Sequence, residues 1–219
     1  MKKTIKFSNA DVDVEEFFLI QLFVNNCCDY LNLDFKNMER KKTESPDFIF
    51  NKDVVGIEIT RALDQNLTKA DKKADSIRNK KFKNMSYCPT LFENEKDESM
   101  PGKEIEKLLE KSKNKLIGKP YVGKGLEDKV VNNIIKSIEK KLKKFKDYKK
   151  CETNILLVHA EDRASLDRTF VIDELKKYVC TKVNSKDMPF NYICLKLADR
   201  FHFFHGDKNC AYDFCVIND

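Results

Sequence analysis

The chain has 219 residues, of which 36% are charged, and its 42 basic and 36 acidic residues give a formal net charge of +6. This length accommodates one well-packed domain and excludes two large ones. The basic excess suits a polyanionic partner, and it equally suits a lysine-rich solvated surface. No apolar run approaches the length of a membrane span, and the N-terminal lysines are not followed by the apolar core of a signal peptide.

Eight cysteines lack the spacing of a zinc site or a disulfide framework, and several fall on apolar faces as small core residues. The nearest approach to a metal cluster consists of His202, His205, Cys194, Cys210 and Cys215. Because His202 and His205 would face opposite sides of a strand, we expect packing rather than zinc binding. Free thiols without an export signal predict a cytoplasmic protein.

The first predicted element is a helix over residues 12–33. Its apolar stripe consists of Ile20, Phe23, Val24, Cys27 and Leu31. Glu16 falls on the same stripe. It is either a carboxylate that is favourable near the positive helix N-terminus or a functional acid on that face.

A β-hairpin is predicted next, with strands at residues 44–50 and 54–60 around a polar turn at 51–53. Alternation puts Glu58 on the strand face opposite the apolar residues, and Asp47 lies on the incoming strand, so the two carboxylates can converge. A buried carboxylate needs a partner, and no Arg or Lys lies on the same strand face near Glu58. A hard divalent cation would supply that partner, which predicts a metal site for cutting phosphodiester bonds.

We expect residues 1–219 to form a single domain. Within it, residues 66–125 are predicted to form a lysine-rich helical insertion that largely faces solvent. A stronger amphipathic helix is predicted over 127–148, with Lys141 at the edge of its apolar stripe. The remaining predicted elements are a buried strand at 154–159 and a helix at 164–180 that buries Leu166, Phe170, Leu175 and Val179. Closing strands are predicted at 190–204 and 211–217, joined around Gly206-Asp207. This order indicates a mixed α/β sheet protein.

The hairpin carries a recognisable motif: Pro46-Asp47, then ten intervening residues, then Glu58-Ile59-Thr60 at the end of a strand. This motif resembles that of the PD-(D/E)XK, or restriction-endonuclease-like, nuclease superfamily. The element order resembles that superfamily from Glu16 to about Val158. The resemblance implies a restriction-endonuclease-like mixed sheet flanked by helices, with the lysine-rich segment as an insertion.

The resemblance also implies roles for individual residues. Asp47 and Glu58 would bind a divalent metal, Mg²⁺ or Mn²⁺, and the Ile59 carbonyl would supply a further oxygen. Glu16 matches a first-helix glutamate that some members use for a water-mediated or second-metal contact.

Thr60 departs from the superfamily pattern, which has a lysine there to position or deprotonate the attacking water. Some members move this lysine to the following helix, where Lys141 is the best candidate here. The weaker candidates are Lys144, Lys69 and Gln65. Alternatively, Lys141 only extends its charge to water along an apolar surface.

These features predict a metal-dependent nuclease acting on DNA rather than RNA, because no aromatic-rich RNA-recognition signature is present. The basic residues expected at backbone phosphates are Arg61, Lys69, Lys72 and Lys73. Double-strand cutting with one site per chain would favour a homodimer. Two alternatives remain: a catalytically silent nuclease-like domain that binds nucleic acid or protein, and an unrelated interaction protein in which Glu58 pairs with a distant lysine.

Overall fold

The computed structural model describes residues 14–33, 35, 38–40, 46–51, 53–62, 126–148, 150–160, 166–184, 188–207 and 210–217. The chain divides into two compact units. The sheet and its helices belong to the first unit, residues 1–62, 127–162 and 168–219. The second unit, residues 63–126 and 163–167, lies almost entirely outside the described ranges, as does the insertion predicted at 66–125.

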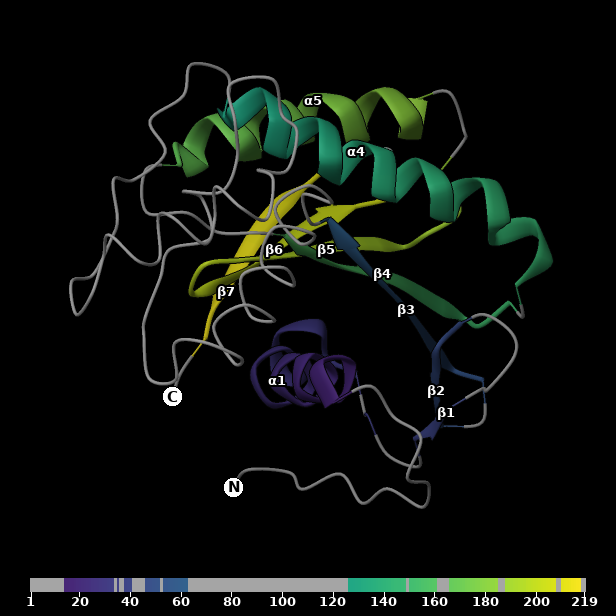
Figure 1. Ribbon diagram of the computed structural model, residues 1–219. Coiled ribbons are helices and arrows are strands. Elements are labelled where there is room, and N and C mark those ends of the chain that lie inside the picture. The colour runs from purple at the N-terminus through teal and green to yellow at the C-terminus, as the bar shows by residue number, and fades with distance from the viewer. Residues whose placement is uncertain are drawn as a thin grey trace, which may run out of the picture. The chain divides into compact units, whose positions relative to one another are not determined.

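A seven-stranded mixed sheet forms the centre of the first unit, with its strands in chain order from β1 to β7 (Figure 1). The strands are β1 (Glu39–Arg40), β2 (Phe48–Phe50), β3 (Val55–Ala62), β4 (Thr153–Ala160), β5 (Tyr192–Leu197), β6 (Arg200–His205) and β7 (Tyr212–Val216). Strands β3, β4 and β5 are parallel, and all other neighbours are antiparallel. The predicted mixed α/β sheet is therefore confirmed.

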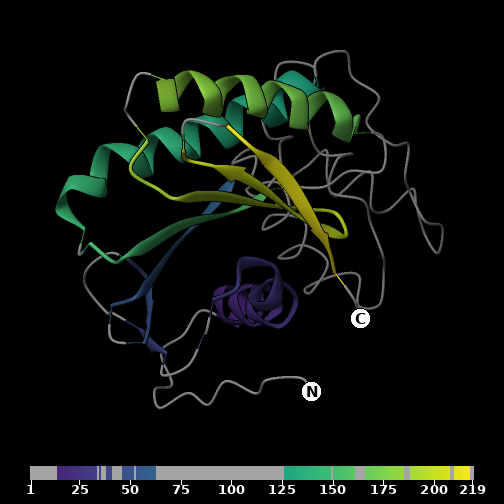
Figure 2. The same cartoon turned by 180° about the vertical axis from the view of Figure 1, so that it is seen from behind.

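Helices cover both faces of this sheet. Helix α1 (Val14–Leu31) lies on one face, whereas α4 (Leu126–Lys144) and α5 (Arg168–Asn184) lie together on the other (Figures 1 and 2). Each of the latter two connects a pair of parallel strands, as such connections require. None of the helices in the described ranges is long and apolar enough to cross a membrane.

The core on the α1 face follows the predicted helix stripe. Four of its side chains are fully buried: Ile20, Phe23, Val24 and Cys27. They pack against inward-facing residues of five strands, including Phe48, Ile57, Leu157, Cys194 and Phe203. These strand residues are hydrophobic at alternate positions and therefore share one face of the sheet. The apolar stripe of α1 packs on that face, and the two together form one continuous core.

The predicted hairpin is formed by β2 and β3, whose register joins Phe50 to Val55. The turn between them holds Asn51 at φ 52° and Asp53 at φ 83°. Asn and Asp tolerate this left-handed region better than most residues, because their short side chains bond to nearby backbone. The polar turn therefore fixes the pairing that brings the two strands together.

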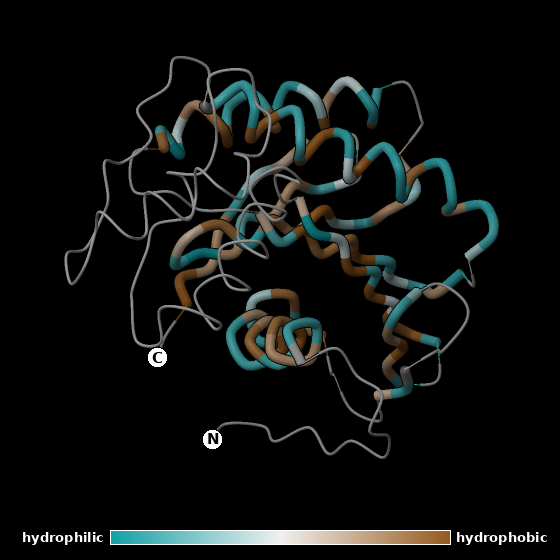
Figure 3. The backbone as a smooth tube through the Cα atoms, viewed as in Figure 1, coloured by the Kyte–Doolittle hydropathy of each residue, from teal (hydrophilic) through white to brown (hydrophobic). Residues whose placement is uncertain are grey.

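Helix α4 confirms the predicted amphipathic helix, and hydrophilic and hydrophobic residues alternate along it (Figure 3). Its apolar side buries Val131, Ile134 and Ile138 against the sheet. The α-helix ends at Lys144, and the rest of the predicted span continues as a short 3₁₀ helix, η2 (Phe145–Asp147). That tighter turn changes the direction of the chain before β4.

The strand predicted at residues 190–204 is wrong, because two antiparallel strands, β5 and β6, occupy this range. The chain reverses at Ala198, which adopts φ 53°. Ala has no preference for a left-handed conformation, so the turn lacks the Gly or Asn that marks most tight hairpins. The joint predicted around Gly206-Asp207 is confirmed, since it connects β6 to β7.

The helix predicted at residues 164–180 is displaced, since α5 begins at Arg168 and ends at Asn184. Phe170 is 38% exposed rather than buried, and the neighbouring Val171 and Ile172 are buried instead. The later start leaves Phe170 in the first turn of the helix, at the end of the apolar stripe. Leu166, Leu175 and Val179 are buried as predicted.

Candidate functional site

The β2–β3 hairpin places Asp47 and Glu58 side by side. Phe48 pairs with Ile57, so the next pair outward is Asp47 opposite Glu58. Residues directly opposite each other in adjacent strands project to the same face, with Cβ atoms about 5 Å apart. The convergence of two carboxylates is thus a consequence of the hairpin register.

Backbone hydrogen bonds fix both carboxylates. The Asp47 N–H donates to Glu58 Oε2 at 3.2 Å, and the Ile59 N–H donates to Asp47 Oδ2 at 2.7 Å. In an extended strand, the N–H and C=O of one residue point to the same side. The Ile59 carbonyl therefore points toward the strand edge where Asp47 lies.

Glu58 is only 2% exposed and faces α4. Lys141 of α4 forms an ion pair with Glu58 Oε1, and the Tyr148 hydroxyl donates to the same oxygen at 3.0 Å. Burial raises the pKa of the Glu58 carboxyl and Asp47 raises it further, while Lys141 and Tyr148 act in the opposite direction. Within the described residues, the site therefore consists of the buried Glu58 carboxylate, the half-buried Asp47 carboxylate beside it, and the Lys141 ammonium in contact with Glu58.

Sequence reasoning did not select Tyr148, although a signal existed. In the helix predicted over residues 127–148, Tyr148 follows Lys141 by seven residues, which is two helical turns and therefore the same face, although in the structure Tyr148 has extended backbone after η2. Tyr148 is also 8% exposed, and a buried tyrosine usually finds a hydrogen-bond partner. The predicted Lys141 face thus marked Tyr148 as a candidate, whereas its contact with Glu58 depends on the turn at η2.

The other predicted site residues take separate positions. Thr60 lies two residues after Glu58 on the same face of β3 and is half-buried. Glu16 lies in the first turn of α1, on the opposite side of the sheet, and it forms no metal-binding group with Asp47 and Glu58. Arg61 also projects toward α1, where its Nη1 contacts Glu15 Oε2 at 2.7 Å.

No family model, curated protein or solved structure matches this chain. The similarity to a nuclease motif at Asp47 and Glu58 therefore stays a resemblance. What the two carboxylates can do is argued from their own geometry.

Several predicted residues contribute nothing to the described geometry. Four lie outside the described ranges: Gln65, Lys69, Lys72 and Lys73. Lys144 is exposed at the end of α4, whereas Lys141, three residues earlier, is largely buried. Of the two lysines predicted on this helix, Lys141 is the one that reaches the carboxylates.

Histidine and cysteine side chains take structural positions. His202 is buried, and its Nδ1 lies 2.8 Å from the Tyr212 hydroxyl. Cys194 is buried in the core beneath α1. Across the described part of the chain, no group of three or more His, Cys, Asp or Glu side chains is arranged to hold a metal ion.

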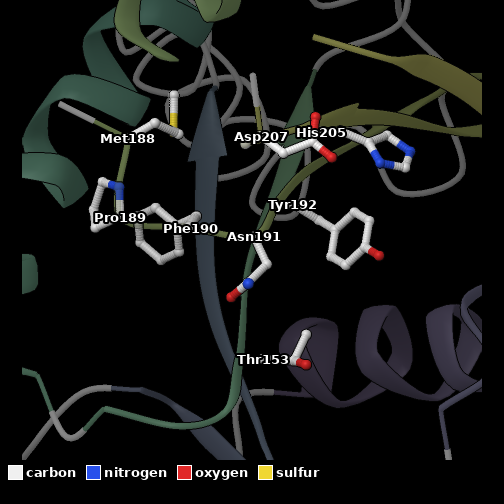
Figure 4. Close-up of a pocket in the computed structure, with 9 residues that line it drawn as sticks. Thr153, Met188, Pro189, Phe190, Asn191, Tyr192, His205 and Asp207 are labelled. Carbon is white, nitrogen blue, oxygen red and sulfur yellow. The ribbon is translucent and has the colours of Figure 1, made fainter. Parts of the chain in front are cut away.

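A separate cavity of about 240 Å³ lies between the start of β5 and the β6–β7 connection (Figure 4). Its lining includes Asn191, Tyr192, His205 and Asp207. Its volume is below the range of about 300–1,000 Å³ that is typical of small-molecule sites. None of the carboxylates of the hairpin lines it, so it does not extend the candidate site.

Proposed function

We propose that this protein is a metal-dependent nuclease that hydrolyses phosphodiester bonds of DNA. The observation that carries the proposal is the contact set of Asp47, Glu58 and Lys141: two carboxylates on adjacent strands, with a lysine bound to one of them. The element order supports it, since α1, three antiparallel strands, α4 and β4 follow one another as in the restriction-endonuclease-like core. A homodimer would place two such sites on one duplex.

The donor set fits Mg²⁺ or Mn²⁺. Mg²⁺ is usually held by one or two carboxylates together with waters and substrate phosphates, and Asp47 and Glu58 supply two carboxylates. Two carboxylates directly opposite each other in a sheet destabilise it unless a cation lies nearby. The chemistry that a divalent cation supplies at such a site is polarisation of the phosphodiester and a lowered pKa of the attacking water.

Lys141 fills the role that Thr60 does not. Thr60 and Glu58 share one face of β3, and the Lys141 ammonium reaches that same face from α4. A lysine at this position offsets the negative charge that develops on the phosphate and orients the attacking water. Lys141 of the neighbouring helix therefore supplies the lysine that the superfamily pattern has at the position of Thr60.

Cleavage assays on the full chain test the proposal with plasmid and single-stranded DNA. Mg²⁺ or Mn²⁺ should support cleavage and EDTA should abolish it. Asp47→Asn and Lys141→Met should each lower the rate by about 10²-fold or more. Matched controls on α4 are Asp128→Asn and Lys144→Met, which should retain activity, because both side chains are exposed. Absence of cleavage of DNA and RNA with either metal would contradict the proposal, and so would cleavage that survives Asp47→Asn.

A second candidate is a catalytically silent nuclease-like domain. It is favoured by Glu58 Oε1, which already accepts from both Lys141 and Tyr148, so Glu58 is partnered without a metal. Thermal unfolding with added Mn²⁺ separates the two. If the site binds metal, Mn²⁺ at a concentration 100 times its Kd should raise the free energy of unfolding by about 2.7 kcal/mol. Glu58→Gln should remove this increase. A melting temperature that Mn²⁺ does not change favours the silent domain.

A further inference from the structure

The carboxyl ends of the three parallel strands carry a row of basic side chains. Arg61, His159 and Lys196 are each the penultimate residue of β3, β4 and β5. The registers align Arg61 with His159 and His159 with Lys196. Adjacent strands lie about 4.8 Å apart, so the three side chains start as direct neighbours.

All three side chains project from the face that α1 covers. Two residues before each of them, Ile59, Leu157 and Cys194 belong to the core beneath α1, and residues two apart share a strand face. The row is not sealed into that core. Arg61 is 29% exposed in its side chain, and His159 and Lys196 are half-buried.

The row concentrates positive charge. Burial lowers the pKa of His159, and the nearby Lys196 and Arg61 charges lower it further, whereas Glu15 opposes them. His159 is therefore neutral at pH 7 and lies between two cations, Arg61 and Lys196, which would both attract an anion placed among the three side chains. The row lies at the carboxyl ends of the three parallel strands, one residue before each strand ends.

Two contacts of the row, Arg61 with Glu15 and Lys196 with the Ala198 carbonyl, are of kinds that an anion can displace or join. Glu15, which is 71% exposed, reaches Arg61 at 2.7 Å, so one carboxylate already sits against the row. An ion pair this exposed contributes little stability and is easily exchanged. The Lys196 ammonium donates to the Ala198 carbonyl at 2.6 Å, a contact that leaves its other protons available.

We propose that Arg61, His159 and Lys196 form a binding site for a phosphate group, supplied by a nucleic-acid backbone or by free phosphate. The Arg61 guanidinium matches two phosphate oxygens at once, Lys196 adds a point charge, and His159 donates one N–H. Phosphate binding requires only these three side chains, so it does not depend on cleavage at Asp47 and Glu58.

Histidine NMR tests the site in the full chain with EDTA present. The chain has three histidines, so His→Gln variants assign each Cε1–H resonance. Inorganic phosphate and a single-stranded DNA oligonucleotide are titrated separately, against sodium chloride at equal ionic strength. We expect the His159 resonance to shift and its pKa to rise, since an adjacent anion stabilises the imidazolium. A shift with both probes supports a site for the phosphate group itself, and a shift with the oligonucleotide alone assigns the site to the backbone.

Two variants give opposite results if the site exists. Lys196→Ala should weaken binding about tenfold or more, and it should reduce the salt dependence of oligonucleotide binding by about one counterion. Glu15→Gln should tighten binding about two- to fivefold, because it removes the competing carboxylate. Glu15 is exposed, so that variant keeps the test valid if Lys196→Ala fails to fold.

Lys177→Ala is the matched control, since it removes one positive charge from the exposed side of α5. It should leave phosphate binding unchanged. The proposal is overturned if His159 stays unmoved by both probes, if all three histidines shift equally, or if Glu15→Gln does not tighten binding.

Discussion

The Glu58 carboxylate is one of the few polar groups buried in the described part of the chain, and each of its oxygens has a partner. Oε1 accepts from Lys141 and Tyr148, and Oε2 accepts from the Asp47 N–H. A buried charge is tolerated only when it is paired and hydrogen-bonded. Removing a partner therefore costs more than the pair contributes, because the charge stays buried.

Lys141→Met should lower the free energy of unfolding by about 3–5 kcal/mol, since it leaves Glu58 without its cation. Urea denaturation with EDTA present measures the change without any contribution from metal binding. Lys144→Met, in the next turn of the same helix, should stay within about 0.5 kcal/mol of the wild type. Equal stability of the two variants would show that the ion pair does not hold Glu58 in the folded protein.

His202 gives the stability a defined pH dependence. Burial lowers its pKa to about 4, with Arg200 and Lys176 acting in the same direction and Asp199 against it. In the unfolded chain the pKa is about 6.5, so between these values the unfolded state binds more protons. This contribution is complete above pH 6.5 and is lost as the pH falls toward 4, by about 3 kcal/mol in all.

Urea midpoints measured from pH 4 to pH 7 check this dependence. His202→Gln should flatten the curve in that window, because it removes the group that binds a proton in the unfolded chain and not in the folded one. If the stability of His202→Gln and of the wild type changed with pH in parallel, His202 would not be the cause of this pH dependence.

At the scale of elements, the hairpin depends on the absence of a side chain at Gly56. A Cβ there would lie 2.8 Å from Pro46 Cγ and 2.8 Å from Cys151 Sγ. The Pro46 ring cannot rotate away, and it directly precedes Asp47. Close approach of another part of the chain is a common reason for a glycine within a strand.

Gly56→Ala should therefore destabilise the protein by about 1–3 kcal/mol, through overpacking between β3 and its neighbours. Cys151→Ala removes the second contact. The cost of Gly56→Ala should be smaller in that background than in the wild type, because neighbouring substitutions are not additive. Chemical denaturation of the four proteins in this cycle measures the coupling, and an unchanged cost would exclude Cys151 as the obstacle.

Elements with strong periodicity could be predicted from the sequence. Alternation around Glu58 predicted the hairpin, and with it the approach of Asp47. The stripe of α4 predicted that Lys141 borders the sheet. What determines the rest is tertiary: Ala198 reverses the chain without a turn residue, and Tyr148 reaches Glu58 only because η2 redirects the chain after α4.

At the scale of the whole molecule, the first described helix and the last strands form one core. Phe23 of α1 packs edge-on against Phe201 of β6, with ring centroids 5.5 Å apart, and also against Phe35 at 5.9 Å. Cys215 of β7 donates its thiol to the Asn26 carbonyl of α1 at 3.0 Å. Contacts between segments this far apart in sequence require the closure of long loops, which predicts slow, cooperative folding.

Phe23→Ala tests this packing, because Phe23 is fully buried between α1 and β6. It should lower the free energy of unfolding by about 3–5 kcal/mol, through lost burial and the cavity left behind. Phe18→Ala is the matched control on the same helix, since Phe18 is 65% exposed, and it should change stability by less than about 0.5 kcal/mol. Both are measured by urea unfolding, followed by circular dichroism and by tyrosine fluorescence. If Phe23→Ala leaves the two probes coincident and the midpoint unchanged, α1 does not close the core.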